Sequence, residues 1–253
     1  MSNQIMTKLV AEFIGTFSFV FIGAGTASVI GDGVGLPGMA AIALAHGLAI
    51  MAFAFAYGSV SGGHMNPAVT VGVLAAGAMN PIDAIGYVAS QLVGGIAGAL
   101  LLRTLLGGVA TGLGTPELAH DLALGGVSLT ITPVAGFVIE AVLAFFLVTV
   151  VLSTAVAGRA GNLAPLAIGM TLTFNILMGG ALTGAAFNPA RALGRWWRPE
   201  NSTMPGCTWQ LQSSALSSLP SCTRAFVGSP MRRWHRREWP RRQPNDRIGT
   251  HAM

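Results

Sequence analysis

The chain has 253 residues, of which 52% are hydrophobic and only 9% are charged. Soluble domains carry roughly 25% charged residues, so this composition excludes an ordinary soluble protein and predicts an integral membrane protein. The charges are unevenly divided: residues 1–194 hold four basic and six acidic residues, a net charge of −2, whereas residues 195–253 hold ten arginines and three acidic residues, a net charge of +7.

Residues 1–194 contain five segments long and apolar enough to cross a bilayer, for which about 20 residues are needed. The predicted spans are Leu9–Ile30, Pro37–Ser59, Ala84–Leu102, Pro133–Gly158 and Ala164–Thr183. The first is too long and too acidic to be a signal peptide. Lys8 and Arg159 favour a cytoplasmic N-terminus by the positive-inside tendency, and Arg103 opposes it. Small residues at Gly94 and Gly98 predict close helix packing.

The two halves of this region repeat one pattern. Each begins a span with an intramembrane glutamate, Glu12 or Glu140, and each later carries a related segment, SGGHMNPAVT (residues 61–70) or TGAAFNPARA (residues 183–192). The glutamate precedes the Asn-Pro-Ala asparagine by 54 residues in the first half and by 48 in the second. Three spans per half, an odd number, would insert the two copies with opposite topology.

Each Asn-Pro-Ala motif opens an apolar stretch that is too short to span the membrane. Asn66 and Asn188 are suitable helix N-caps, and Pro67 and Pro189 suit the first helical position, where no N–H is needed. Two half-helices entering from opposite faces would meet near the midplane with their positive dipole ends together. Paired short segments of this kind indicate a transport site, because unwound backbone at that depth is tolerated where it lines a cavity.

These motifs resemble the aquaporin, or major intrinsic protein, family of water and small-solute channels, and the resemblance covers residues 6–194. It implies an all-α membrane fold with an inverted repeat: six tilted helices and two half-helices around one pore in each subunit, assembled as a homotetramer. In that family both motifs line the pore, which here assigns them Asn66, Pro67, Ala68, Asn188, Pro189 and Ala190. Each asparagine would cap its helix and also donate an amide N–H to passing water, interrupting a proton wire.

The resemblance also implies a narrow selectivity filter. Arg191 follows the second motif, and the family register gives His46, Ile176 and Ala185 as the other members of the ring. This ring is similar to those of water channels that also admit ammonia or hydrogen peroxide. Glycerol facilitators usually place Asp directly after the arginine, whereas this chain has Ala192 there. A water channel is therefore favoured, and a glycerol facilitator is the alternative. His46 as a core histidine and Arg191 as a snorkelling residue are the structural alternatives.

Backbone carbonyls before each half-helix would form a ladder of acceptors for water, from Gly62, Gly63, His64, Gly184, Ala185 and Ala186. Glu12 and Glu140 are expected to accept hydrogen bonds from backbone N–H groups of these loops, rather than to relay protons. His64 is expected to brace its loop, with pH gating as the alternative.

The sequence gives no sign of an enzyme. No nucleotide-binding loop or catalytic triad is visible, and His46, His64 and His120 lack metal-ligand spacing, so no cofactor or metal is expected. The expected partners are water, small neutral solutes and the lipid bilayer, with no nucleic acid. The expected location is a bacterial plasma membrane.

The chain divides into an incomplete channel domain, residues 1–194, and a basic tail rich in Trp and Arg, residues 195–253. The family pattern requires a sixth span after the second half-helix, and the tail contains no such run. A tail binding anionic lipid or nucleic acid is one interpretation. We favour a frameshift near the codons for residues 193–195, which would replace the sixth span with a disordered segment. A non-conducting membrane protein is then a further alternative.

Overall fold

The structure is a computed structural model in which residues 3–30, 35–107 and 114–193 are described. Five long apolar helices in this part of the chain confirm the five predicted spans. They are α1 (Asn3–Ile30), α2 (Gly35–Ser61), α4 (Pro81–Leu105), α5 (Pro133–Val151) and α6 (Ala164–Thr183). A π-helical turn, Leu152–Val156, continues α5 at its C-terminal end, and a 3₁₀ turn, Gly161–Leu163, precedes α6.

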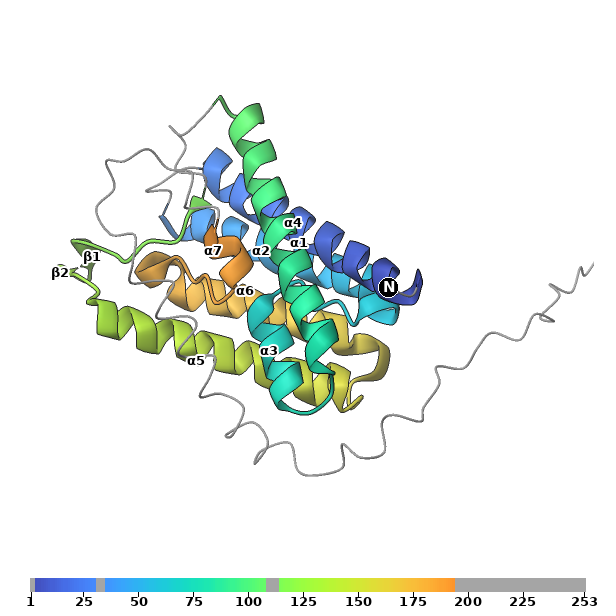
Figure 1. Cartoon of the computed structure of the whole chain (residues 1–253). Coiled ribbons are helices and arrows are strands. Elements are labelled where there is room, and N and C mark those ends of the chain that lie inside the picture. The colour runs from blue at the N-terminus through green and yellow to red at the C-terminus, as the bar shows by residue number, and fades with distance from the viewer. Residues whose placement is uncertain (1–2, 31–34, 108–113, 194–253) are drawn as a thin grey trace, which may run out of the picture.

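The two predicted half-helices are also present. They are α3 (Pro67–Ala75) and α7 (Pro189–Ala192), which lie among the long helices, as Figure 1 shows. The two half-helices contact each other. One short antiparallel hairpin, β1 (Leu122–Leu124) with β2 (Val127–Leu129), departs from the all-α prediction. Gly125 and Gly126 form its two-residue turn with φ angles of 54° and 85°, which glycine adopts at no steric cost. This Gly-Gly signal lies in the sequence, but the prediction did not use it.

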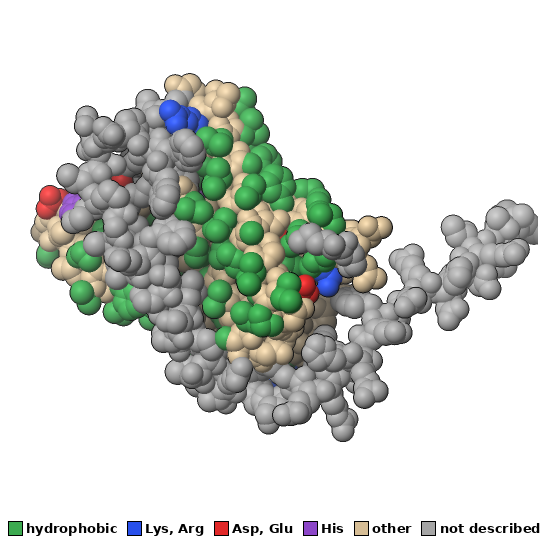
Figure 2. All heavy atoms as spheres, in the orientation of Figure 1, with side chains coloured by type: hydrophobic (Ala, Val, Ile, Leu, Met, Phe, Trp, Pro, Cys, Tyr) green, Lys and Arg blue, Asp and Glu red, His purple; other side chains and the backbone are tan. Residues whose placement is uncertain are grey.

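Large apolar side chains cover the outside of the helix bundle, and polar side chains are buried within it. Ile82 and Val134 are 81% and 73% exposed, whereas Glu12 and His46 are fully buried. Figure 2 shows apolar side chains over the outer face of α4, with the visible charged side chains near the ends of the helices. Burying polar groups away from lipid is required because hydrocarbon offers them no hydrogen bonds.

Glycines on α4 bring that helix into direct contact with two others. An added Cβ at Gly94 would lie 2.5 Å from the Phe13 carbonyl oxygen of α1, and one at Gly98 would lie 2.7 Å from that of Phe17. The predicted small-residue packing is therefore confirmed. A Cβ at Gly95 would lie 2.4 Å from the Ala190 carbonyl oxygen, so α4 also touches α7, the half-helix that carries Arg191.

The expectations of a lost sixth span and a disordered basic tail concern residues 194–253, which lie outside the described residues.

Candidate functional site

Glu12 of α1 binds the loop that leads into α3. Its Oε1 accepts hydrogen bonds from the Ser61 hydroxyl (2.6 Å) and the His64 backbone N–H (2.9 Å), and its Oε2 accepts from the Met65 N–H (2.6 Å). The Gln91 side-chain amide of α4 adds a fourth bond, also to Oε2, at 2.7 Å. A fully buried carboxylate needs such donors, because burial removes its water. Glu12 thereby joins α1, α4 and the loop.

Glu140 of α5 makes the corresponding bonds to the loop before α7. Its Oε1 accepts from the Thr183 hydroxyl (2.6 Å) and the Ala186 N–H (3.0 Å), and its Oε2 accepts from the Phe187 N–H (2.6 Å). The two halves therefore share the hydroxyl and the two backbone N–H bonds of each loop, and the Gln91 bond to Glu12 has no counterpart at Glu140 among the described residues.

The two loops share an unusual backbone conformation. Positive φ angles occur at three matched pairs of positions: Gly62 (91°) and Gly184 (78°), Gly63 (61°) and Ala185 (45°), and Met65 (49°) and Phe187 (22°). Non-glycine residues pay a steric penalty of about 1–3 kcal/mol in such regions. The bonds to Glu12 and Glu140 fall on these segments, and they hold conformations that the loops would not keep alone.

Asn66 and Asn188 cap their half-helices and also join the two loops. Each side-chain oxygen accepts a backbone N–H of its own helix, that of Ala68 (2.8 Å) or Ala190 (3.0 Å). Each side-chain nitrogen donates across the molecule: Asn66 to the Phe187 carbonyl and Asn188 to the Met65 carbonyl, both at 3.0 Å. One of the two N–H groups on each amide is thus engaged, which leaves the second for another acceptor.

Arg191 is bound by carbonyl groups of the loop before its own helix. One guanidinium nitrogen, Nη1, donates to Gly184 O at 2.9 Å and to Ala185 O at 2.7 Å. The side chain is only 6% exposed, and its Nε is buried without a hydrogen-bond partner among the described residues. Two of the six carbonyls expected to form the ladder therefore accept from Arg191.

His46 of α2 is fully buried and lies within electrostatic reach of Arg191. Its Nδ1 is 2.8 Å from the Ile42 carbonyl oxygen. Because a carbonyl can only accept, Nδ1 carries the proton, and Nε2 of the neutral ring is an acceptor. No described residue bonds to this Nε2.

The other two expected ring members are buried nearby. Ile176 is 2% exposed on α6, which packs on α2, and Ala185 is fully buried beside Gly179 of the same helix. The structure links Arg191 to Ala185 by a hydrogen bond.

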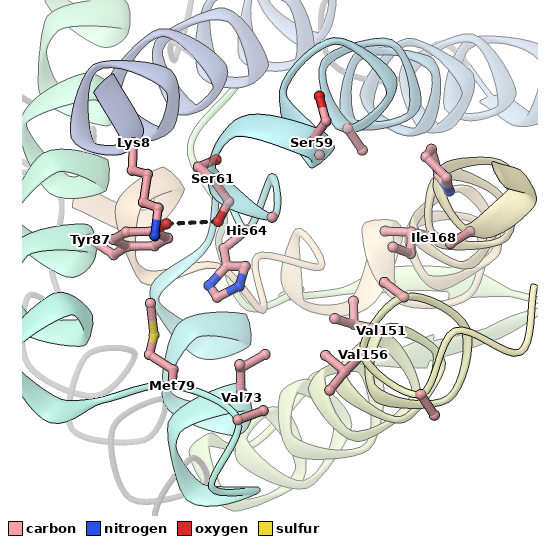
Figure 3. A pocket seen from close by; sticks show the side chains of 18 of the residues that line it. Lys8, Ser59, Ser61, His64, Val73, Met79, Tyr87, Val151, Val156 and Ile168 are labelled. Atoms are coloured by element: carbon pink, nitrogen blue, oxygen red, sulfur yellow. Dashed lines mark hydrogen bonds between the residues drawn. The ribbon is translucent and has the colours of Figure 1, made fainter. Parts of the chain in front are cut away.

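A cavity of about 870 Å³ opens beside the first loop. Figure 3 shows Ser61, His64 and Tyr87 on one side of it, with Val151, Val156 and Ile168 on the opposite side. His64 is held by the Thr70 hydroxyl, 3.1 Å from Nδ1, and by an edge-to-face contact with Tyr87. Tyr87 in turn donates to the Ser61 carbonyl at 2.7 Å. Of the first three expected ladder residues, Gly62 and His64 line this cavity.

The sequence prediction missed several residues of this site. Ser61 and Thr183 occupy the first position of the two related decapeptides, and this shared hydroxyl was a usable signal. Gln91, fully buried, is a single strongly polar residue in an apolar span, which is also visible from sequence. The Asn-to-carbonyl bonds between the loops carry no sequence signal, because backbone carbonyls occur at every residue.

Comparison with known proteins gives the family. The family model described as "Major intrinsic protein" matches residues 1–197. The chain belongs to the major intrinsic protein family. Proteins of this family are membrane channels rather than enzymes, and with its five long apolar helices this member is an integral, multi-pass membrane protein.

Curated proteins similar to this chain include several from plants. The probable aquaporin TIP3-2 of Arabidopsis thaliana is 41% identical over 197 residues, which cover 73% of this chain and 70% of the relative. Aquaporin NIP1-3 of Oryza sativa subsp. japonica is 36% identical over 197 residues, which cover 76% of this chain and 64% of the relative. Nodulin-26 of Glycine max is 36% identical, with 76% and 68% covered.

A solved structure supports the same fold. The aquaglyceroporin from Plasmodium falciparum superposes with a TM-score of 0.70 at 21% sequence identity, covering 88% of this chain and 95% of that one. At this identity the likeness establishes the aquaporin fold of the major intrinsic protein family, and it carries no information on the solute.

Proposed function

We propose that this protein is a passive water channel, with a filter formed by His46, Ile176, Ala185 and Arg191. The observation that carries the proposal is a pair of buried polar atoms, His46 Nε2 and Arg191 Nε, without protein partners in the described part of the chain. A buried polar group left unsatisfied costs about 1–3 kcal/mol, so both atoms require a small polar partner. Water supplies a donor for Nε2 and an acceptor for Nε.

The charge of Arg191 and the two asparagines explain how such a path would exclude ions. A fixed guanidinium repels cations, including hydronium, at a narrow point of a pore. Asn66 and Asn188 each keep one N–H beyond the bond to the opposite loop. Two donors at the meeting point of the loops orient a water oxygen toward both, which breaks a continuous chain of hydrogen-bonded water.

The polarity of the filter favours small solutes that both donate and accept hydrogen bonds. Water meets this description, and so do ammonia and hydrogen peroxide, which we propose as further solutes. The aquaporin names of the plant relatives support water. A glycerol facilitator is the second candidate, and uptake of glycerol by vesicles separates the two.

We propose residues 1–194 as the channel domain and residues 195–253 as a separate tail, a division that agrees with the end of the family match at residue 197. A homotetramer in the bilayer is the proposed assembly. For location, a bacterial plasma membrane remains the expectation from sequence, and the plant relatives lend it no support.

The experiment is osmotic shrinkage of vesicles that contain the purified 253-residue chain, followed by stopped-flow light scattering. Fast shrinkage with a low activation energy is expected for a water channel. If the protein is inserted but the vesicles shrink no faster than empty ones, the water-channel proposal is wrong and the chain is a non-conducting membrane protein. Parallel measurements of glycerol and ammonia uptake by the same vesicles rank the permeabilities to water, glycerol and ammonia.

A further inference from the structure

The imidazole ring of His46 is held by three groups from two helices. The Ile42 carbonyl of α2 fixes Nδ1 at 2.8 Å. The Phe19 ring of α1 meets the imidazole edge-to-face, with ring centroids 5.5 Å apart and planes at 73°. The third neighbour is Gly23, one turn further along α1.

Gly23 is placed so that any side chain would meet the ring. A Cβ at this position would lie 2.4 Å from His46 Cδ2, 2.6 Å from Nε2 and 2.8 Å from Cγ. Real Cβ atoms essentially never approach another heavy atom so closely. Gly23 lies inside α1 with an ordinary helical conformation, so the need for glycine here is a need for space and not for backbone freedom.

The contact differs from those of the packing glycines. Gly94 and Gly98 let α4 approach backbone atoms of α1, as glycines between membrane helices commonly do. The three nearest atoms to a Cβ at Gly23 all belong to the His46 ring. One of them is Nε2, the acceptor that has no partner among the described residues.

We propose that Gly23 is a specificity-determining residue, which positions His46 in the filter by leaving room for its ring on α1. This inference rests on the proposed filter role of His46. A methyl group at Gly23 forces the imidazole away from α1 or breaks its bond to Ile42. Either movement displaces Nε2, the atom offered to the solute, and changes the width of the passage beside Arg191. Channel selectivity depends on both quantities.

The first test does not depend on conduction. In the full-length protein with ¹⁵N-labelled histidine, Gly23→Ala should shift the side-chain nitrogen resonances of His46, which the His46→Ala spectrum identifies. Gly25→Ala is the matched control, because it adds the same methyl to the same helix, 3.0 Å from the flexible end of Leu102. It should leave those resonances unchanged. Unchanged His46 resonances in Gly23→Ala would overturn the inference, whether or not the chain conducts.

The second test measures permeability. Gly23→Ala should lower water permeability several-fold and lower ammonia permeability by a different factor, whereas Gly25→Ala should keep the ratio of the wild type. In a His46→Ala background the added methyl has no ring to displace, so Gly23→Ala should then have no further effect on the ratio. An equal effect in both backgrounds would show that Gly23 acts on helix packing alone, and the inference would fail.

Folding gives a third readout if Gly23→Ala is not recovered from membranes. The double variant Gly23→Ala/His46→Ala should then be recovered as well as His46→Ala, because the clash is removed. If the double variant is recovered no better than Gly23→Ala, the inference is contradicted, because the loss then does not depend on the His46 ring. Absence of water flux in the wild type, with shifted His46 resonances in Gly23→Ala, would instead refute the proposed function and leave the placement of the ring by Gly23 intact.

Discussion

Asn66 and Asn188 occupy reciprocal positions, since each donates its side-chain N–H to the carbonyl of the residue that precedes the other. Both bonds measure 3.0 Å, and they connect residues more than a hundred positions apart in the chain. The same two side chains cap α3 and α7 through their oxygens. Each asparagine thus uses its acceptor locally and its donor across the molecule.

Asn188→Asp tests the bond between the loops. The substitution keeps the capping oxygen but places a second oxygen opposite the Met65 carbonyl, where the N–H donor stood. We expect the unfolding free energy to fall by about 1–3 kcal/mol, the cost of an unsatisfied buried group, together with a loss of water permeability. Thermal unfolding in detergent and vesicle shrinkage measure the two effects.

Asn80→Asp is the control for this change, because Asn80 caps α4 at an exposed site with its oxygen alone. It should leave both quantities near their wild-type values. If Asn188→Asp is equally silent, the cross-loop bond does not stabilise the site.

Glu140→Gln tests the carboxylate that holds the second loop. An amide nitrogen in place of either oxygen faces a donor, because both oxygens already accept from the protein. Hydrogen bonds to charged groups are each worth about 1.5–3 kcal/mol, so we expect a marked fall in the melting temperature and weaker water flux. Asp121→Asn provides the comparison, because Asp121 is exposed and the amide keeps the Oδ1 that accepts from the Ser128 hydroxyl. Equal melting temperatures for the two variants would contradict the assignment.

Gly95→Ala tests the contact of α4 with the second half-helix. The new methyl would lie 2.4 Å from the Ala190 carbonyl oxygen, which belongs to backbone and cannot swing away. Overpacking of this kind costs about 1–3 kcal/mol, and the displaced α7 carries Arg191 with it. Gly86→Ala on the same helix meets only the flexible end of Leu9 at 3.1 Å and should be tolerated. Equal water flux and equal stability for both variants would show that α7 does not depend on this contact.

Arg191→Val tests the filter charge. Valine removes the cation and leaves the carbonyls of Gly184 and Ala185 without their donor. We expect ammonia permeability to rise relative to that of water, because the passage becomes wider and less polar. Arg103→Val, near the end of α4, should preserve the ratio. Unchanged water and ammonia fluxes in the Arg191→Val vesicles would place Arg191 outside the filter.

Much of the fold was predictable because a helix that spans a lipid bilayer requires a long, continuous apolar segment. The five spans followed from apolar length alone, and the predicted range Ala164–Thr183 is identical to α6. The N-caps followed from Asn-Pro, whose local chemistry determines where a helix begins. The β-hairpin did not follow, because its strands are only three residues long and mostly exposed.

The site was less predictable, because it depends on distances between segments far apart in the chain. The sequence placed Glu12 and Glu140 near the loops through the repeat. It did not reveal that Arg191 uses the Gly184 and Ala185 carbonyls, nor that Gly23 faces the His46 ring. Such contacts depend on how the helices pack together.

The hydrogen bonds of Glu12 have a consequence for the order of assembly during synthesis. All four of its donors lie within the first 91 residues, so the first three-helix unit can complete this network before the second unit leaves the ribosome. The Met65 carbonyl and the Asn66 amide must wait, because their partners are Asn188 and Phe187. A nascent chain that has inserted only its first half can therefore form the bonds of the first loop to Glu12. The bonds between the two loops form only after the second half has inserted.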